Sequence, residues 1–335
     1  MNKITLVDVA RFCHVDISTA SRALRSDPRV KSKTQELVKK AANRLGYRPN
    51  LLAKNLAGGK TNTLWVILPS IDSIVDAKLV HEISRYANSL DYSLFAAFHD
   101  SEEFGVSKGN PIDHYLKIVD SACQGLVDGA IVLPRRFADD SDILSTFVKN
   151  NFPFVFVDNY LEGIPTSVAM TDQKQATENL IHHCLQAGAK EFILLFRNDT
   201  NPVESRRLTS SRDYLIRQRI PFTEICEIEK TWKPKKKGSP ALAVLGSSQA
   251  IFHSYLSEHF SLFLQHKLIF GVFDEWIGEP APAEKVFVGI QNSERLAKEA
   301  IDLLIKKIQS KNKSPKEIKR IPLVECRAIL PSVRL

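Results

Sequence analysis

Residues 5–24 read TLVDVARFCHVDISTASRAL, and this stretch decides the fold of the first part of the chain. Apolar residues recur at helical spacing over residues 6–13, which predicts a short helix. Thr5 and Asp8, three residues apart, form a capping box that starts this helix. After a short break, a second helical segment runs over residues 17–24. Two short helices joined by a tight turn are typical of a helix-turn-helix.

A third helical segment closes this small module. Gly46 ends the segment, because glycine tolerates the left-handed backbone found at helix C-termini. Asp16 is a candidate N-cap for the second segment. In the third segment we expect these side chains to face inward: Thr34, Leu37, Val38, Ala41, Ala42 and Leu45.

Positive charge is concentrated in the same part of the chain. Residues 1–60 contain thirteen Lys and Arg and four Asp and Glu, which gives a net charge of +9. The remaining 275 residues contain 33 basic and 34 acidic side chains, a net charge of −1. A compact basic module beside a nearly neutral body predicts that the module binds a polyanion.

The outward face of the second helical segment carries Ser18, Ser21, Arg22 and Arg25. A helix fits the major groove of B-form DNA, where Arg pairs with guanine and small hydroxyls reach base edges or phosphates. Two exposed arginines taken alone are more simply explained as solvated charge. Because the whole module is strongly basic, we expect this helix to enter the major groove.

The segment that follows the module, residues 47–61, has Pro49 near its start and Gly58-Gly59 near its end. Both features suit the ends of a short helix. About nine residues are too few for a stable isolated helix, so we expect this one to order only in a complex. Leu56 is then a candidate wedge for a base step in the minor groove. An ordinary interdomain linker is the alternative.

The rest of the chain alternates short apolar stretches with helical patterns. Continuous apolar strands between helices predict parallel sheets covered on both faces, and the length suits two doubly wound halves. We expect strands at Thr63–Pro69, Ser93–Phe98, Gly129–Leu133, Pro153–Val157, Glu191–Phe196, Ala241–Leu245, Leu268–Phe273 and Val286–Ile290. We expect helices at Leu79–Leu90, Gln175–Ala187 and Ser293–Ile308.

Ligands of such sheets bind beyond the carboxyl ends of the strands. Asp158, Asp274 and Gln291 each follow an expected strand, and Arg207 is expected to open a helix after a loop. A carboxylate accepts from hydroxyl groups and an arginine fork suits a phosphate, which favours a sugar or sugar phosphate. Charged loop tips without a ligand are the alternative.

Composition and missing motifs narrow the class further. Five scattered cysteines without a C-x-x-C pair indicate reduced thiols, and the sequence shows neither a secretory leader nor a membrane span. We therefore expect a cytoplasmic protein. His182-His183-Cys184 has no second ligand cluster, so we expect no metal, and no cofactor motif is present. The motifs of phosphate-binding loops, zinc proteases and nucleophile elbows are also missing, which argues against an enzyme.

The N-terminal residues resemble the LacI/GalR family of bacterial transcription regulators. The resemblance rests mainly on residues 5–10, 18–24, 45–50 and 59–61. It implies an α/β fold with an N-terminal all-α helix-turn-helix head and a periplasmic-binding-protein-like core of two doubly wound parallel-sheet subdomains. Within the family, residues 168–173 and the stretch around Gln291 most resemble the fructose-repressor branch.

The resemblance also implies roles for individual positions. Ile17, Ser18 and Arg22 contact base edges, and Leu56 enters the minor groove. The implied phosphate contacts are Thr5, Thr19, Ser21, Thr34, Tyr47 and Asn50. The implied domains are 1–46 (helix-turn-helix), 47–61 (hinge helix and linker) and 62–335 (effector-binding and dimerisation core). Within the core, one subdomain comprises about 62–158 and 291–322, and the other about 159–290 and 323–335.

The function implied by the resemblance is repression of carbohydrate genes. A homodimer binds a pseudopalindromic operator in double-stranded DNA, and a sugar or sugar-phosphate effector releases or modulates it. Several expected ligand positions differ from the family, among them Gly246-Ser247, Ser210-Ser211 and Asp158-Asn159. An effector-independent regulator is therefore an alternative. An enzyme acting on sugar phosphates is a rival from another class.

Overall fold

In the computed structural model, the chain forms two compact units, Met1–Thr61 and Asn62–Leu335. The described residues are 4–47, 60–68, 74–98, 111–134, 137–196, 202–225, 241–246, 267–273, 283, 285–311, 316–323 and 325–329. Each unit has a hydrophobic core of its own. The two units are therefore separate folding modules within one chain.

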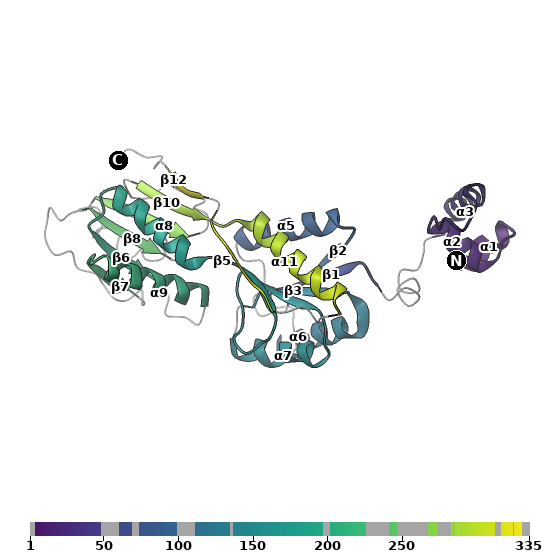
Figure 1. Ribbon diagram of the computed structural model, residues 1–335, viewed down its shortest axis with the longest axis horizontal. Helices are drawn as coiled ribbons and strands as arrows, with labels where there is room; N and C mark the ends of the chain where they lie inside the picture. Colours follow the sequence, from purple (N-terminus) through teal and green to yellow (C-terminus); the bar gives the residue numbers. More distant parts are fainter. Residues whose placement is uncertain are drawn as a thin grey trace. The chain divides into compact units, whose positions relative to one another are not determined.

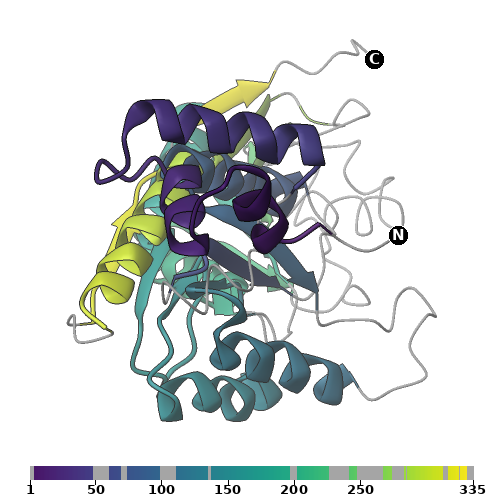
Figure 2. The ribbon, with the colours of Figure 1, turned by 90° about the vertical axis from the view of Figure 1, so that its right-hand side faces the viewer.

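The first unit consists of three helices packed together, drawn in purple in Figure 2. They are α1 (Leu6–Phe12), α2 (Ile17–Leu24) and α3 (Ser32–Leu45). The Asp8 carboxylate accepts hydrogen bonds from the backbone N–H (2.9 Å) and the hydroxyl (2.7 Å) of Thr5, which fixes the start of α1. Gly46 follows α3 with a left-handed φ of 69°. The predicted helix-turn-helix head is confirmed.

Small apolar side chains fill the core of this unit. The buried residues are Val9, Ala10, Cys13, Ala20, Ala23, Val38, Ala41 and Ala42. The expectation that Leu37 faces inward is wrong, because its side chain is 52% exposed. Val38 and its neighbours three and four residues on form the inward stripe, and Leu37 lies about 100° around the helix from Val38. Asp16 occupies the N-cap position of α2, but its side chain makes no capping hydrogen bond.

Two six-stranded sheets form the second unit (Figure 1). The strands are β1 (Thr63–Leu68), β2 (Ser93–Phe98), β3 (Gly129–Val132), β4 (Phe154–Val157), β5 (Ser167–Thr171), β6 (Glu191–Leu195), β7 (Phe222–Ile225), β8 (Leu242–Gly246), β9 (Leu268–Phe273), β10 (Lys285–Ile290), β11 (Ile318–Ile321) and β12 (Glu325–Ile329). The first sheet has the order β11-β5-β4-β3-β1-β2 and the second the order β12-β10-β9-β8-β6-β7. Neighbouring strands are parallel, apart from the antiparallel pair β10 and β12.

Helices cover both faces of the first sheet. They are α5 (Ile74–Ser89), α6 (Pro111–Ser121), the π-helical turn η1 (Ala122–Leu126), α7 (Phe137–Lys149) and α11 (Ser293–Gln309). One face packs against α5 and α11, and the opposite face against α6, η1 and α7 (Figure 1). Two further helices, α8 (Gln173–Gln186) and α9 (Pro202–Arg217), pack on one face of the second sheet. The predicted core of two doubly wound subdomains is confirmed.

Four strands were not predicted from the sequence: β5, β7, β11 and β12. Three of them, β7, β11 and β12, lie at sheet edges. Charged residues interrupt the apolar pattern of edge strands, as in the Ile-Lys-Arg-Ile sequence of β11. β5 pairs in parallel with β4, so the first sheet extends to Thr171. The expected subdomain division near residue 158 therefore comes one strand too early.

Candidate DNA-binding surface and core polar cluster

The outward face of α2 is the candidate DNA-binding surface. Ala20 and Ala23 are fully buried, which turns Ile17, Ser18 and Arg22 to the outside of the head. Ile17 is 50% exposed although its side chain is apolar. An exposed isoleucine at the start of a basic helix suits contact with a thymine methyl group, and arginine suits guanine.

The other predicted DNA contacts are distributed over the head. Thr5 is exposed at the start of α1. The half-buried members of the set are Thr19, Ser21, Thr34 and Tyr47. Tyr47 packs against the core of the head, and burial raises the pKa of its hydroxyl. Asn50, Leu56 and the hinge helix expected around them lie outside the described residues.

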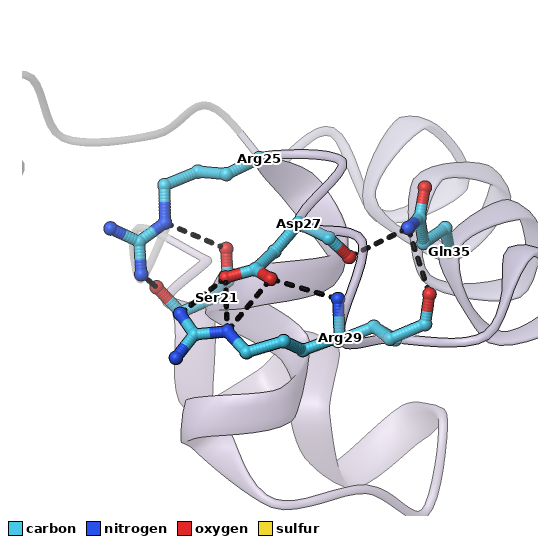
Figure 3. Close-up of polar contacts among 6 residues, drawn as sticks. Ser21, Arg25, Asp27, Arg29 and Gln35 are labelled. Atoms are coloured by element: carbon cyan, nitrogen blue, oxygen red, sulfur yellow. Dashed lines mark hydrogen bonds and ion pairs between the residues drawn. The ribbon is translucent and has the colours of Figure 1, made fainter.

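The turn between α2 and α3 carries a polar network that sequence patterns did not reveal (Figure 3). The Asp27 carboxylate accepts hydrogen bonds from Nε (3.0 Å) and Nη2 (2.7 Å) of Arg29. Gln35 Nε2 donates to the carbonyl oxygens of Asp27 and Val30, each at 2.9 Å. Asp27 lies two residues before Arg29, which is the spacing of an Asx turn, and this spacing could have predicted the turn from the sequence. The Arg29 N–H closes that turn on Asp27 at 3.0 Å.

A largely buried polar group lies where β4, β5 and β10 end. Gln291, which follows β10, donates from Nε2 to Asp158 Oδ1 (2.5 Å) and Thr171 Oγ1 (3.0 Å). Gln291 Oε1 has no hydrogen-bond partner among the described residues. Asp158 follows β4 with a φ of 64°, a left-handed backbone that stores strain in residues other than glycine. The structure thus brings together two of the predicted ligand residues, Asp158 and Gln291.

Arg207 forms a second buried polar group on α9. Its side chain is 6% exposed, and its Nε donates to Gln173 Oε1 at 2.9 Å. The guanidinium carbon lies 4.3 Å from the centre of the Phe273 ring. The expectation that Arg207 opens a helix is wrong, because α9 begins at Pro202. The fourth predicted ligand residue, Asp274, lies outside the described residues.

Three further residues of these groups were missed by sequence reasoning: Thr171, Gln173 and Phe273. Thr171 ends β5 and Gln173 starts α8, so both lie at the carboxyl end of a strand. Identifying residues 167–171 as a strand would have placed them where ligands of doubly wound sheets bind. We refer to Asp158, Thr171, Gln173, Arg207 and Gln291 as the polar cluster.

The polar cluster contains buried amide atoms without partners. Gln291 Oε1 is an acceptor and Gln173 Nε2 is a donor, and both lack a hydrogen bond to any residue that the structure describes. A buried unsatisfied polar atom costs about 1–3 kcal/mol. A polar ligand that pairs with either atom would remove this cost for that atom. The Asp158 carboxylate in the first group can accept from hydroxyl groups, and the Arg207 guanidinium in the second can bind an anionic group.

A cavity of about 360 Å³ lies beside the start of α9. It is lined by Ser141, Tyr160, Leu161, Glu162, Pro202 and Arg206. The Arg206 guanidinium lies 4.9 Å from the centre of the Tyr160 ring and donates a hydrogen bond to Asn159. Asn159 in turn donates to the Pro134 carbonyl oxygen at 3.1 Å. These contacts connect α9, which covers the second sheet, to loops of the first sheet.

The described ranges contain neither a candidate membrane span nor a candidate metal site. No helix there combines the length and the apolar character needed to span a bilayer. The same ranges hold no group of three or more His, Cys, Asp and Glu side chains arranged to bind a metal ion. His183 lies half-buried on α8, with its ring stacked 5.5 Å from that of Phe287. This placement agrees with a structural role for that histidine.

Comparisons with known proteins agree with this architecture. Residues 5–50 match the family described as bacterial regulatory proteins, lacI family. Catabolite control protein A of Staphylococcus xylosus is 25% identical over 243 residues, covering 72% of this chain and 70% of that protein. The HTH-type transcriptional regulator AscG of Escherichia coli (strain K12) is 26% identical over 232 residues, covering 69% of this chain and 66% of AscG.

Solved structures share the fold over most of the chain. A lac repressor dimer bound to operator and the anti-inducer ONPF has a TM-score of 0.73 at 19% identity, covering 97% of this chain and 98% of that chain. The Cra transcriptional dual regulator of Pseudomonas putida, in complex with fructose 1-phosphate, has a TM-score of 0.60 at 15% identity. That match covers 81% of this chain and 99% of the Cra chain.

A helix-turn-helix head and a core of two doubly wound sheets, together with these relatives, define a DNA-binding transcription regulator. Its head matches the lacI family of bacterial regulatory proteins over residues 5–50, and 72% of the chain is similar to catabolite control protein A. The relatives are regulators of transcription and not enzymes, which removes the sugar-phosphate enzyme from the alternatives.

Proposed function

We propose that this protein represses carbohydrate-metabolism genes in the cytoplasm, as a homodimer on a pseudopalindromic operator, under control of a sugar or sugar phosphate. The DNA-binding part rests on the exposed face of α2 within a segment of net charge +9. The effector part rests on the polar cluster and its two unpartnered amide atoms.

On DNA, α2 enters the major groove. Arg22 pairs with a guanine, Ile17 meets a thymine methyl group and Ser18 hydrogen-bonds a base edge. Phosphates are held by Thr5, Thr19, Ser21, Thr34, Tyr47 and Asn50, which set the position of the head on the duplex. Leu56 enters a base step of the minor groove at the operator centre.

A second copy of the chain is needed because a pseudopalindromic operator has two half-sites related by a twofold axis. Support for a homodimer comes from β2, an edge strand of the first sheet. Phe95 on this strand is 58% exposed, and Phe98 is also exposed. Exposed aromatic side chains on an edge strand favour association, so we place β2 in the contact between the two copies.

The effector of our proposal pairs its hydroxyl groups with Asp158 and Gln291, and an anionic group with Arg207. A sugar phosphate presents both kinds of group. A membership in the fructose-repressor branch, suggested by residues 168–173, would agree with this chemistry. Effector binding changes the angle between the subdomains, which releases or modulates the DNA-bound state.

An effector-independent regulator is the second candidate. One observation favours it: the residues of the polar cluster already bind one another. Arg207 is engaged by Gln173 and the Phe273 ring, and Gln291 by Asp158 and Thr171. In this case the polar cluster stabilises the core and receives no ligand.

Mapping genomic fragments that the full-length protein retains would test the DNA-binding part of the proposal. We expect fragments that share an inverted repeat upstream of carbohydrate genes, with increased transcription of those genes when the protein is absent. Retained fragments without a shared inverted repeat would contradict binding as a symmetric pair of heads.

Calorimetric titration with a panel of sugars and sugar phosphates separates the two candidates. We expect at least one compound to bind and Arg207→Ala to weaken its binding. Arg217→Ala, at an exposed arginine near the end of the same helix, is the matched control and should bind normally. No binding across a broad panel would favour the effector-independent regulator.

A further inference from the structure

The side chain of Arg29 is held in place although most of its surface is exposed to solvent. Its exposed fraction is 73%, whereas that of its partner Asp27 is 16%. The pair is side-on, with Nε and Nη2 of the guanidinium donating to the two carboxylate oxygens at 3.0 and 2.7 Å. The backbone N–H of Arg29 donates to the same carboxylate at 3.0 Å. Asp27 therefore fixes both the backbone and the side chain of Arg29.

Asp27 is itself fixed to the helix that follows. Gln35 on α3 donates to the carbonyl oxygens of Asp27 and Val30, so the turn is closed against α3 (Figure 3). The side-chain hydrogen bonds from Arg29, then its backbone N–H, hold the pKa of the Asp27 carboxyl far below its usual range, with a further contribution from the charge of Arg22. The Asp27 carboxylate of the folded protein is therefore ionised at neutral pH.

The geometry leaves part of the Arg29 guanidinium available to a ligand. A guanidinium has five N–H donors, and the side-on pair uses two of them. An arginine whose rotamer is already fixed loses less conformational entropy when it binds an anion. The planar Arg29 guanidinium is thus prepared to donate to the oxygens of an anion such as a phosphate.

A second arginine on the same turn is held in a similar way. Arg25 donates from Nε to the Ser21 carbonyl and from Nη2 to the Ser21 hydroxyl, both at 3.3 Å. Figure 3 shows the Arg25 and Arg29 guanidinium groups on the same side of the turn. On α3, Lys39 Nζ donates to Ser26 Oγ at 2.7 Å. Arg25, Arg29 and Lys39, at the end of α2, in the turn and on α3, are therefore all held by hydrogen bonds.

A solvated ion pair is the simpler explanation of Asp27 and Arg29, since exposed pairs contribute little to stability. Two features argue against it. The aspartate is one of only two acids in residues 17–47, within a head of strongly positive net charge. Its hydrogen bonds orient an arginine in the turn that follows α2, the helix that we propose enters the groove.

We propose that Arg29 binds a backbone phosphate at the outer edge of the operator half-site, and that Asp27 is the positioning residue that orients it. This inference rests on the proposed function, in which α2 enters the major groove. Phosphate contacts at the end of a recognition helix set its register on the duplex.

The test measures the affinity of full-length variants for a mapped operator and for random duplex over a range of salt concentrations. Arg29→Ala should weaken binding to both duplexes and lower the slope of log K against log salt by about 0.9, the release of counterions from one phosphate. Arg44→Ala is the matched control. Arg44 lies on α3 beside the Phe12 ring of α1, and its removal should change the slope less.

The role of Asp27 is tested by the sign of the effect of Asp27→Asn. If Asp27 positions Arg29, the variant binds operator more weakly although its net charge is one unit more positive. In the Arg29→Ala background, the same change should strengthen binding, because only the removal of a negative charge remains. A structural defect would weaken binding in both backgrounds, and circular dichroism checks the fold of each variant.

The outcomes separate this inference from the proposed function. If Arg22→Ala impairs operator binding but Arg29→Ala leaves the salt slope unchanged, the phosphate contact is wrong and the docking of α2 stands. If Asp27→Asn strengthens operator binding with Arg29 present, the positioning role is wrong. If neither Arg22→Ala nor Arg29→Ala changes binding, the docking of α2 itself fails.

Discussion

Arg22 and Arg207 lie in opposite environments, which suits them to different ligands. Arg22 is exposed on α2 in the basic head. Arg207 is buried on α9 between Gln173 and the Phe273 ring. An exposed arginine can hydrogen-bond the edge of a base, whereas a buried arginine can bind only a ligand that enters the core. These environments support our proposal that Arg22 contacts DNA and Arg207 the effector.

Arg22→Ala should cost about 1–3 kcal/mol of binding free energy at the operator and relax the preference for one base. The reason is the loss of a bidentate contact to a guanine of the operator. Random DNA has no guanine fixed at that position, so its binding should weaken less. Fluorescence anisotropy with operator and random duplexes measures both affinities. An equal loss on the two duplexes would identify Arg22 as a phosphate contact instead.

Individual site residues were predictable where a strong strand precedes them. Asp158 and Gln291 follow the apolar strands β4 and β10, and the structure joins them by a hydrogen bond. Thr171 and Gln173 were missed because their strand, β5, was not predicted. The pair of Asp27 and Arg29 was missed because a short polar turn has no periodicity. Its geometry depends on the contact of Gln35 with the turn, which no local pattern encodes.

At the scale of elements, an apolar sequence pattern explains which strands were predicted: the exposed edge strand β2 is apolar enough to be recognised, whereas the buried β5 (Ser-Val-Ala-Met-Thr) was missed. The eight predicted strands all form, each within one residue of its expected ends. Four of them, β3, β4, β8 and β9, are buried along their whole length, so their residues are continuously apolar. β7 and β11 are partly exposed edge strands, and they were not predicted because polar residues interrupt their apolar pattern.

The edge strand β7 is held to α9 by one ion pair. Arg212 donates from Nε and Nη2 to the two carboxylate oxygens of Glu224, both at 2.7 Å. These hydrogen bonds, opposed by desolvation, lower the pKa of Glu224 from its usual value of 4.5. Because the folded-state pKa is the lower one, the pair stabilises the fold above pH 4.5, and this contribution is lost as the pH falls through the folded-state pKa.

Glu224→Gln should lower the free energy of unfolding at pH 7 by about 0.5–1 kcal/mol, since the pair is partly exposed and screened by solvent. The difference from the unmodified protein should shrink as the pH falls below 4.5. Urea denaturation at several pH values measures it. Glu162→Gln, at an exposed glutamate, serves as the control. A pH-independent difference would show that the charge of Glu224 is not what stabilises β7.

At the scale of the molecule, the two sheets of the core repeat one strand order. In the first sheet, β1 lies second from one edge and β2 forms that edge. In the second sheet, β6 and β7 occupy the same two positions. The chain passes between the sheets after β5, after β10 and after β11. Sequence patterns predicted two doubly wound halves, but the points of crossing depend on strand pairing, which they do not encode.

Phe95→Asp should convert the proposed homodimer to a monomer, because a carboxylate would be buried without a partner in the contact at β2. Analytical ultracentrifugation measures the oligomeric state. Ile216→Asp is the matched control, since Ile216 is an exposed apolar residue on α9. A dimer that persists in Phe95→Asp would place the contact between copies away from β2.

DNA binding by the head is the claim on which the rest depends, and a truncated chain tests it most directly. The affinity of residues 62–335 for duplex DNA would be measured beside that of the full chain at several salt concentrations. We predict that the truncated protein loses both the affinity and its dependence on salt, because the net charge of +9 lies in residues 1–60. Unchanged affinity with the same salt dependence would contradict the account.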